Sequence, residues 1–203
     1  MVVYLFNFNT CQDLALLEIG DQQCSPLYAF GPNIRNEYIF HYVVSGKGVV
    51  MLQPSGEKGQ NILSETIEVK AGEGFLIEPH TAHMYRADEN DPWHYIWIVF
   101  TGLSVPSYLR ACGLTRNNPV FYPQSYAHAV SSRVREPLRQ ILGHPDASKA
   151  FIIGQLHLFF DGLMENTAVQ SKNRYDGYQY RQCLHCGGDA LYRIALCGYS
   201  LAG

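Results

Sequence analysis

The sequence has no hydrophobic run long enough to cross a bilayer and no excess of positive charge. Its longest apolar runs, such as Tyr38–Val44 and Ala150–Ile153, are far shorter than a membrane-spanning helix, and no basic stretch followed by an apolar one opens the chain. Eighteen acidic against fifteen basic residues give a formal charge of −3, which does not favour contact with a phosphate backbone. We expect a soluble, cytoplasmic chain that has no membrane partner and does not bind DNA on its own.

The sequence also lacks a dense cysteine framework. Six cysteines scattered over 203 residues do not form the dense disulfide framework of a small secreted domain, so we expect reduced thiols. Cys183 and Cys186 have the spacing of half a zinc site or of a redox pair, but no second pair and no βαβ pattern accompanies them. We interpret them as a chance cluster in the C-terminal tail.

What the sequence does contain, from residue 28 to residue 100, is a series of short aromatic and β-branched runs separated by turn residues. The runs 38–44 and 49–52, joined by glycines, predict a hairpin. Further strands are expected near residues 65–69, 75–77, 83–87 and 93–100. Short strands at such regular spacing are typical of a sandwich or a barrel.

Helical periodicity begins after residue 102. Residues 125–143 carry apolar side chains at helical spacing and predict one helix broken near Pro137. Residues 146–165 predict a second helix with one wide apolar face. A polar linker is expected over residues 166–173, followed by a tail rich in Tyr, Gly and Cys.

Three ordered motifs, Glu37–Gly48, Gly72–Pro79 and Pro92–Gly102, resemble the arabinose-binding-domain type of AraC-family regulators. The resemblance spans roughly residues 28–165. It implies a mainly β fold with α, in which a cupin-like β-barrel (a jelly roll) is followed by C-terminal helices. The implied organisation is a barrel over residues 1–104, a helical dimerisation segment over 105–166, and a linker and tail over 167–203.

In that family the barrel binds a small-molecule effector, often a sugar or related polyol, and the helices pair two protomers. A further C-terminal domain with two helix-turn-helix motifs reads DNA. Residues 174–203 contain no recognisable helix-turn-helix and are too short for two. We therefore expect DNA contact only through a domain that is absent from this chain or unrecognisable in it.

Aromatic residues of the last strand are the leading candidates for a ligand site. Alternation places Trp93, Tyr95, Trp97 and Val99 on one face. The resemblance implies that Tyr95 and Trp97 face the lumen and touch the sugar, with Tyr85 joining them from the neighbouring strand. An indole packs well on the C–H face of a pyranose, and a phenol hydroxyl bonds a sugar hydroxyl. The alternative is that these aromatics only fill the barrel core.

The strand over residues 38–44 is apolar on both faces, so alternation does not decide which side faces inward. The resemblance implies that Ile39 and His41 line the lumen and that Arg35 lies at its mouth. His83 is expected to be a pocket-lining or structural residue beside Tyr85. The alternative reading is an exposed Arg35 and a structurally hydrogen-bonded His41.

Two rival functions follow from the same barrel. One is a metal-dependent cupin enzyme, an isomerase or dioxygenase, whose metal would be bound by histidines of the barrel region. The candidates are His41, His80, His83 and His94. Such enzymes need two histidines one residue apart with a carboxylate following, and that pattern is missing. We therefore predict no catalytic residue, metal or cofactor. A barrel with a filled lumen, acting only as a dimerisation scaffold, is the other alternative.

The helix over residues 146–165 is the expected dimer contact. Leu156, Phe160 and Leu163 follow one another at spacings of four and three, so they lie along one line of the helix. We predict that they meet their copies across a two-fold axis in a homodimer. The competing arrangement packs the whole stripe inward on the barrel and on the helix over residues 125–143.

Overall fold

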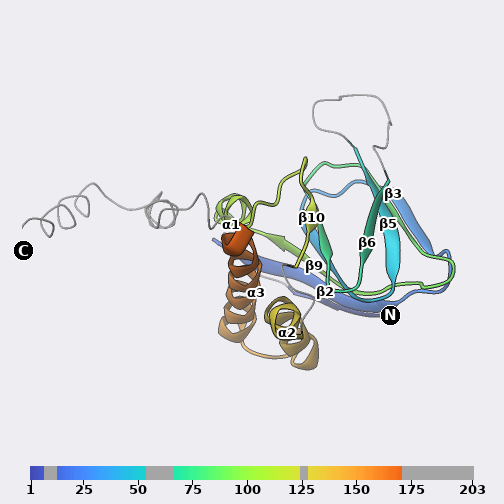
Figure 1. Ribbon diagram of the computed structural model, residues 1–203. Helices are drawn as coiled ribbons and strands as arrows, with labels where there is room; N and C mark the ends of the chain where they lie inside the picture. The colour runs from blue at the N-terminus through green and yellow to red at the C-terminus, as the bar shows by residue number, and fades with distance from the viewer. Residues whose placement is uncertain (7–12, 54–65, 124–127, 171–203) are drawn as a thin grey trace, which may run out of the picture. The chain divides into compact units, whose positions relative to one another are not determined.

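The chain folds into two facing antiparallel sheets with helices packed on one of them, as a computed structural model of residues 1–6, 13–53, 66–123 and 128–170 describes (Figure 1). The first sheet has the strand order β1-β2-β9-β4-β7-β10 and the second has the order β3-β8-β5-β6. The strands are β1 (Val2–Leu5), β2 (Ala15–Gln23), β3 (Ala29–Asn33), β4 (Tyr38–Ser45), β5 (Lys47–Leu52), β6 (Ile67–Lys70), β7 (Gly74–Ile77), β8 (His83–Ala87), β9 (His94–Thr101) and β10 (Val120–Phe121).

The strand-rich barrel followed by helices confirms the predicted fold class, but the expected hairpin is wrong. β4 pairs with β7 and β9 in the first sheet, whereas β5 pairs with β6 and β8 in the second. The chain changes sheet at Gly46, whose φ is +69°. A Cβ there would lie 2.6 Å from the Pro92 carbonyl oxygen, so this corner requires glycine.

β2 was not predicted, and it contains an irregularity that matters for the site. It pairs with β9, where Leu16 lies opposite Phe100 and Glu18 lies opposite Val99, so Leu17 is an extra residue in a β-bulge. Before the bulge Leu16 faces the helices, and after it Ile19 does. The bulge thereby turns Glu18 away from the helix-covered core and towards the lumen.

Three helices lie in the described part of the chain: α1 (Val105–Ala111), α2 (His128–Gly143) and α3 (Lys149–Gln170). α2 continues through Pro137 without a break, and α3 extends five residues beyond the expected end at residue 165. Residues 1–170 form one compact unit, and β10, from the segment expected to be purely helical, pairs with β7 of the barrel. Most of the expected tail, including Cys183 and Cys186, lies outside the described residues.

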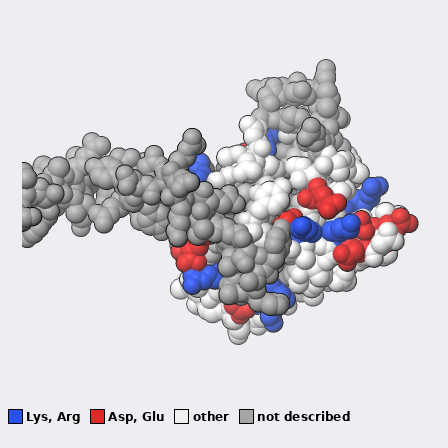
Figure 2. All heavy atoms as spheres, viewed as in Figure 1, with Lys and Arg blue, Asp and Glu red and all other residues white. Residues whose placement is uncertain are grey.

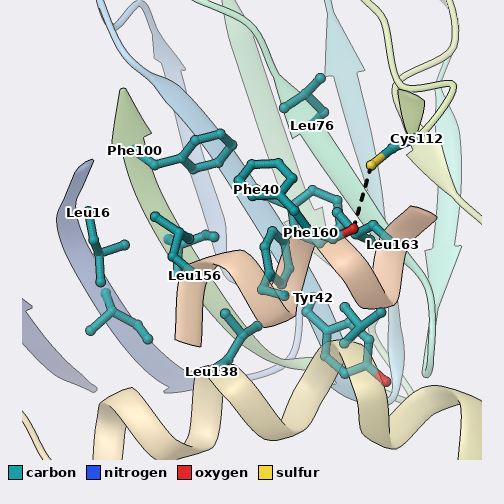
Figure 3. Packing of buried hydrophobic residues seen from close by; sticks show 14 of the residues in the cluster. Leu16, Phe40, Tyr42, Leu76, Phe100, Cys112, Leu138, Leu156, Phe160 and Leu163 are labelled. Carbon is teal, nitrogen blue, oxygen red and sulfur yellow. Dashed lines mark hydrogen bonds between the residues drawn. The ribbon is translucent and has the colours of Figure 1, made fainter. Parts of the chain in front are cut away.

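The apolar residues form two separate cores. One lies between the six-stranded sheet and the helices, and the other lines the barrel lumen. In the first core Phe40 meets Phe159 edge to face, with ring centroids 5.3 Å apart. Phe100 meets Phe160 in the same way, with ring centroids 5.5 Å apart (Figure 3). The Cys112 thiol, at the end of α1, lies 4.0 Å from the Phe160 carbonyl oxygen of α3, so α1 also packs on α3.

This packing corrects the predicted dimer contact. Leu156, Phe160 and Leu163 are 0 %, 1 % and 0 % exposed within a single chain, because they cover the apolar outer face of the six-stranded sheet. Side chains enclosed in this way cannot meet a second copy. The competing arrangement, with the stripe packed inward, is the one observed.

Candidate functional site

A pocket of about 100 Å³ opens into the barrel lumen. That volume is several times the ~10–15 Å³ that one water requires, so the lumen is not filled solid. All seven residues predicted to bind a ligand line it. The full lining is Met1, Glu18, Gln22, Tyr28, Phe30, Arg35, Ile39, His41, His83, Tyr85, Tyr95, Trp97 and Val99.

β4 and β9 supply one wall of the pocket. Ile39 and His41 point inward from β4, while Tyr95 and Trp97 point inward from β9, as the family resemblance implied. Tyr85 is placed differently from the expectation. Its strand, β8, belongs to the four-stranded sheet, so Tyr85 faces Tyr95 across the lumen, with ring centroids 6.0 Å apart and planes at 90°. The two sheets therefore close on the pocket from opposite sides.

Sequence reasoning missed several lining residues. Val99 had a signal, because alternation placed it on the same face as Trp97. Phe30 had no such signal. It lies on β3 and stacks on Tyr85 with ring centroids 5.1 Å apart, a contact that depends on the pairing of β3 with β8. Glu18 was hidden by the bulge, since unbroken alternation would group it with the helix-facing Leu16.

Glu18 holds a charged pair at the pocket. The Trp97 indole Nε1 donates to Glu18 Oε1 at 2.7 Å, and Arg35 Nη1 donates to Glu18 Oε2 at 3.0 Å. The indole reaches the carboxylate by lying across Gly20, where a Cβ would come within 2.1 Å of the ring. The Glu18 side chain is only 15 % exposed and that of Arg35 is 37 % exposed, so the carboxylate of this pair is shielded from water and the guanidinium is partly open to it.

Two buried histidines stand at the pocket. His41 is stacked on Phe75 with ring centroids 4.5 Å apart, and its Nδ1 has no hydrogen-bond partner among the described residues. His83 Nδ1 lies 3.0 Å from the Thr81 carbonyl oxygen, so it donates there. Burial lowers the pKa of both imidazoles, that of His41 further, and Arg35 adds to the effect at each. Both rings are neutral at pH 7.

The pocket tyrosines are neutral as well. Burial raises the pKa of Tyr85 and of Tyr95, so both hydroxyls stay protonated and can donate a hydrogen bond. The Tyr95 hydroxyl lies 3.5 Å from Gln22 Oε1, at the limit of a hydrogen bond. Among the lining side chains the charges of Glu18 and Arg35 cancel. The pocket offers aromatic faces, neutral donors and acceptors, and no net side-chain charge.

A second hollow of about 230 Å³ lies on the outside of the four-stranded sheet and differs in chemistry. Its lining includes Lys47, Glu68, Arg86, Asp88 and Glu89, which are charged residues of both signs. On the face drawn in Figure 2, positive and negative side chains are likewise interspersed. Without aromatic walls this hollow has nothing to orient an organic ring, so the lumen pocket is the candidate site.

The histidines do not gather into a metal site. His94 bonds Asp21 at 2.9 Å and lines neither pocket, and His80 is exposed. Among the residues that the structure describes, no group of three or more His, Cys, Asp or Glu is placed to hold a metal ion. No helix in the same residues is long and apolar enough to span a membrane.

The barrel and its lumen pocket define a class of β-barrel domains that hold a ligand between two sheets. Residues 17–159 match the family described as AraC-like ligand binding domain, and the chain belongs to that family. The resemblance drawn from the three sequence motifs is thereby confirmed.

Relatives of the chain agree with this assignment. The Msm operon regulatory protein of Streptococcus mutans is 26% identical over 159 residues, which are 75% of this chain and 51% of the relative. The raffinose operon transcriptional regulatory protein RafR of Pediococcus pentosaceus is 33% identical over 87 residues, 42% of this chain and 28% of the relative. The chain thus spans about half the length of these relatives or less. YhaK of Escherichia coli superposes with a TM-score of 0.40 at 14% identity, covering 50% of this chain and 44% of YhaK.

Proposed function

We propose that this chain is the effector-sensing part of an AraC-type transcription regulator and that its effector is a neutral sugar. The observation that carries the proposal is the lumen pocket, in which the side-chain charges of Glu18 and Arg35 offset each other and Trp97 offers a flat apolar face. Such a face packs on the C–H side of a pyranose ring, while Tyr85, Tyr95 and the neutral His41 bond its hydroxyls.

The name of one relative supports the same ligand class. The Pediococcus pentosaceus protein is named for a raffinose operon. Raffinose is an uncharged oligosaccharide that ends in a galactopyranosyl ring, so a neutral galactoside is a reasonable first probe of this pocket.

The sensor acts by binding and carries out no chemistry on its ligand. On β4 and β9, residues that face the lumen alternate with residues that pack on the helices: His41 follows Phe40, and Trp97 lies between Ile96 and Ile98. A sugar that shifts either strand therefore shifts the surface on which α3 rests. Regulation requires only that the sugar binds one arrangement of strand and helix more tightly than another. In this proposal homodimer formation uses surfaces outside the lumen. Contact with DNA is made by a part of the regulator other than residues 1–170.

Thermal unfolding of the chain with raffinose and with methyl α-D-galactopyranoside tests the proposal. A sugar at one hundred times its dissociation constant stabilises the folded chain by about 2.7 kcal/mol, which raises the melting temperature by roughly 5–10 °C at this chain length. Trp97→Ala and Tyr95→Ala should remain folded and lose the shift. Mannitol at equal concentration controls for solvent effects. The absence of a shift with every neutral sugar in a broad panel would contradict the proposal.

A further inference from the structure

We propose that Glu18 is a sugar-contacting residue that sets the charge selectivity of the lumen pocket. Its carboxylate accepts hydrogen bonds from the hydroxyls of a neutral pyranoside and, by neutralising Arg35, keeps sugar acids and sugar phosphates from binding well. The inference rests on the proposed function and names the ligand class of the same site more narrowly.

The first support is the way the carboxylate is held. Each oxygen of Glu18 receives one donor, Trp97 Nε1 at 2.7 Å and Arg35 Nη1 at 3.0 Å. An ionised carboxylate has about four acceptor positions, so about two remain for ligand hydroxyls. The guanidinium of Arg35 likewise has donors to spare beyond the one used. A carboxylate fixed from two sides is already oriented before a sugar arrives.

The second support is that two local irregularities bring this carboxylate to the pocket. The bulge at Leu17 turns Glu18 inward, and Gly20 leaves space for the indole that bonds it. A bulge interrupts the ladder and a glycine weakens a strand interior. Both therefore disfavour a regular β2, and both place Glu18 beside the same tryptophan ring that forms the apolar platform.

The third support is the charge count of the lining side chains. His41, His83, Tyr85 and Tyr95 are neutral, so Glu18 and Arg35 are the charged side chains of the pocket and they cancel. Without Glu18, Arg35 would present an uncompensated positive charge to the ligand. A guanidinium of that kind binds carboxylates and phosphates strongly.

Calorimetric titration of the full chain with a matched pair of sugars tests this inference. The probes are methyl α-D-galactopyranoside and its C6 acid, methyl α-D-galacturonoside, which differ only by the carboxylate. The wild-type chain should favour the neutral sugar. Glu18→Gln should weaken the neutral sugar by about 10- to 100-fold, since it replaces a charged acceptor, and should strengthen the acid relative to it by about tenfold or more.

Matched variants make the result specific. Asp21→Asn removes one negative charge from the same strand at a residue that lines neither pocket, and it should change neither affinity. Arg35→Gln leaves Glu18 uncompensated and should widen the preference for the neutral sugar. This reciprocal variant also keeps the test decisive if Glu18→Gln does not fold.

The outcomes separate the inference from the proposed function. If the wild-type chain binds neither sugar nor raffinose, sugar sensing fails and the inference falls with it. If the wild-type chain binds the neutral sugar but Glu18→Gln weakens both probes equally, Glu18 only positions Trp97 and the inference alone is overturned. A wild-type chain that binds the acid as tightly as the neutral sugar overturns it as well.

Discussion

Gly20 determines where the Trp97 indole lies, and this makes it a sensitive residue of the site. A Cβ at residue 20 would come within 2.1 Å of the ring, so Gly20→Val should displace the indole and break its bond to Glu18. We expect the affinity for methyl α-D-galactopyranoside to fall about tenfold or more, because an aromatic platform and an oriented acceptor are lost together. Calorimetry measures the loss, and unchanged affinity would show that the indole is not held as described.

The buried histidines predict a pH-dependent stability. The folded chain keeps His41 and His83 neutral because burial lowers the pKa of each below the ordinary value of 6.5. The unfolded chain takes up protons as the pH falls through 6.5, so the folded state is destabilised there by up to about 1.4 kcal/mol per pH unit for each imidazole.

Urea unfolding between pH 7 and pH 5 measures this slope. His41→Gln should reduce it by about 1 kcal/mol per pH unit, because the group that the unfolded chain protonates is gone. A parent chain with the same stability at both ends of the range would contradict the neutral state assigned to both rings.

At the residue scale, seven of the lining residues were predicted from the sequence and the family resemblance, but Glu18, Tyr28 and Phe30 were not. Alternation along β9 placed Tyr95 and Trp97 on one face, because that strand is regular, and the family resemblance indicated that this face is the lumen side. Glu18 required knowledge of a bulge, and Phe30 required the pairing of β3 with β8. Neither can be read from a local pattern, since each depends on a partner strand far away in the sequence.

Two glycines of α3 provide a matched test of how the helices pack. A Cβ at Gly162 would lie 2.7 Å from the Arg133 carbonyl oxygen of α2, whereas one at Gly154 would meet nothing within 4 Å. Gly162→Ala should therefore destabilise the chain by about 1–3 kcal/mol through overpacking. Gly154→Ala should stabilise it by about 0.5–1 kcal/mol through better helix propensity. Thermal or urea unfolding gives both values, and equal effects would contradict the close approach of α2 and α3.

The strands were easier to predict than their partners. Runs of aromatic and β-branched residues located β4, β5, β7, β8 and β9, yet the glycines after β4 were interpreted as a hairpin turn when they mark a change of sheet. Sheet membership depends on which faces are buried together. β4 is apolar on both faces because it separates the lumen from the helix-covered core, and its sequence alone does not distinguish the two.

For the whole molecule, a dimer formed through α3 would have to use a face other than the buried Leu156, Phe160 and Leu163. Leu158 is 53 % exposed on this helix, unlike the enclosed Phe160. We expect wild-type chains at tens of micromolar to be dimeric by light scattering. The Leu158→Glu chain should be monomeric and should remain folded. Phe160→Glu should instead unfold or aggregate, because it buries a charge. A monomeric wild-type chain would exclude the dimer, and an unaffected Leu158→Glu dimer would exclude this face.

β4 and β9 each serve as a wall shared by two cores, and this has a consequence for how effectors should differ from one another. Packed protein interiors have low compressibility, so a wall moved on the lumen side moves by a similar amount on the helix side. Under the proposed function, how tightly a sugar binds would depend on its bonds to the pocket, whereas how far it moves the wall would depend on its bulk. In a sensor built this way affinity and efficacy are separate properties. A small sugar that satisfies every donor and acceptor without pressing on Trp97 would be a tight-binding antagonist.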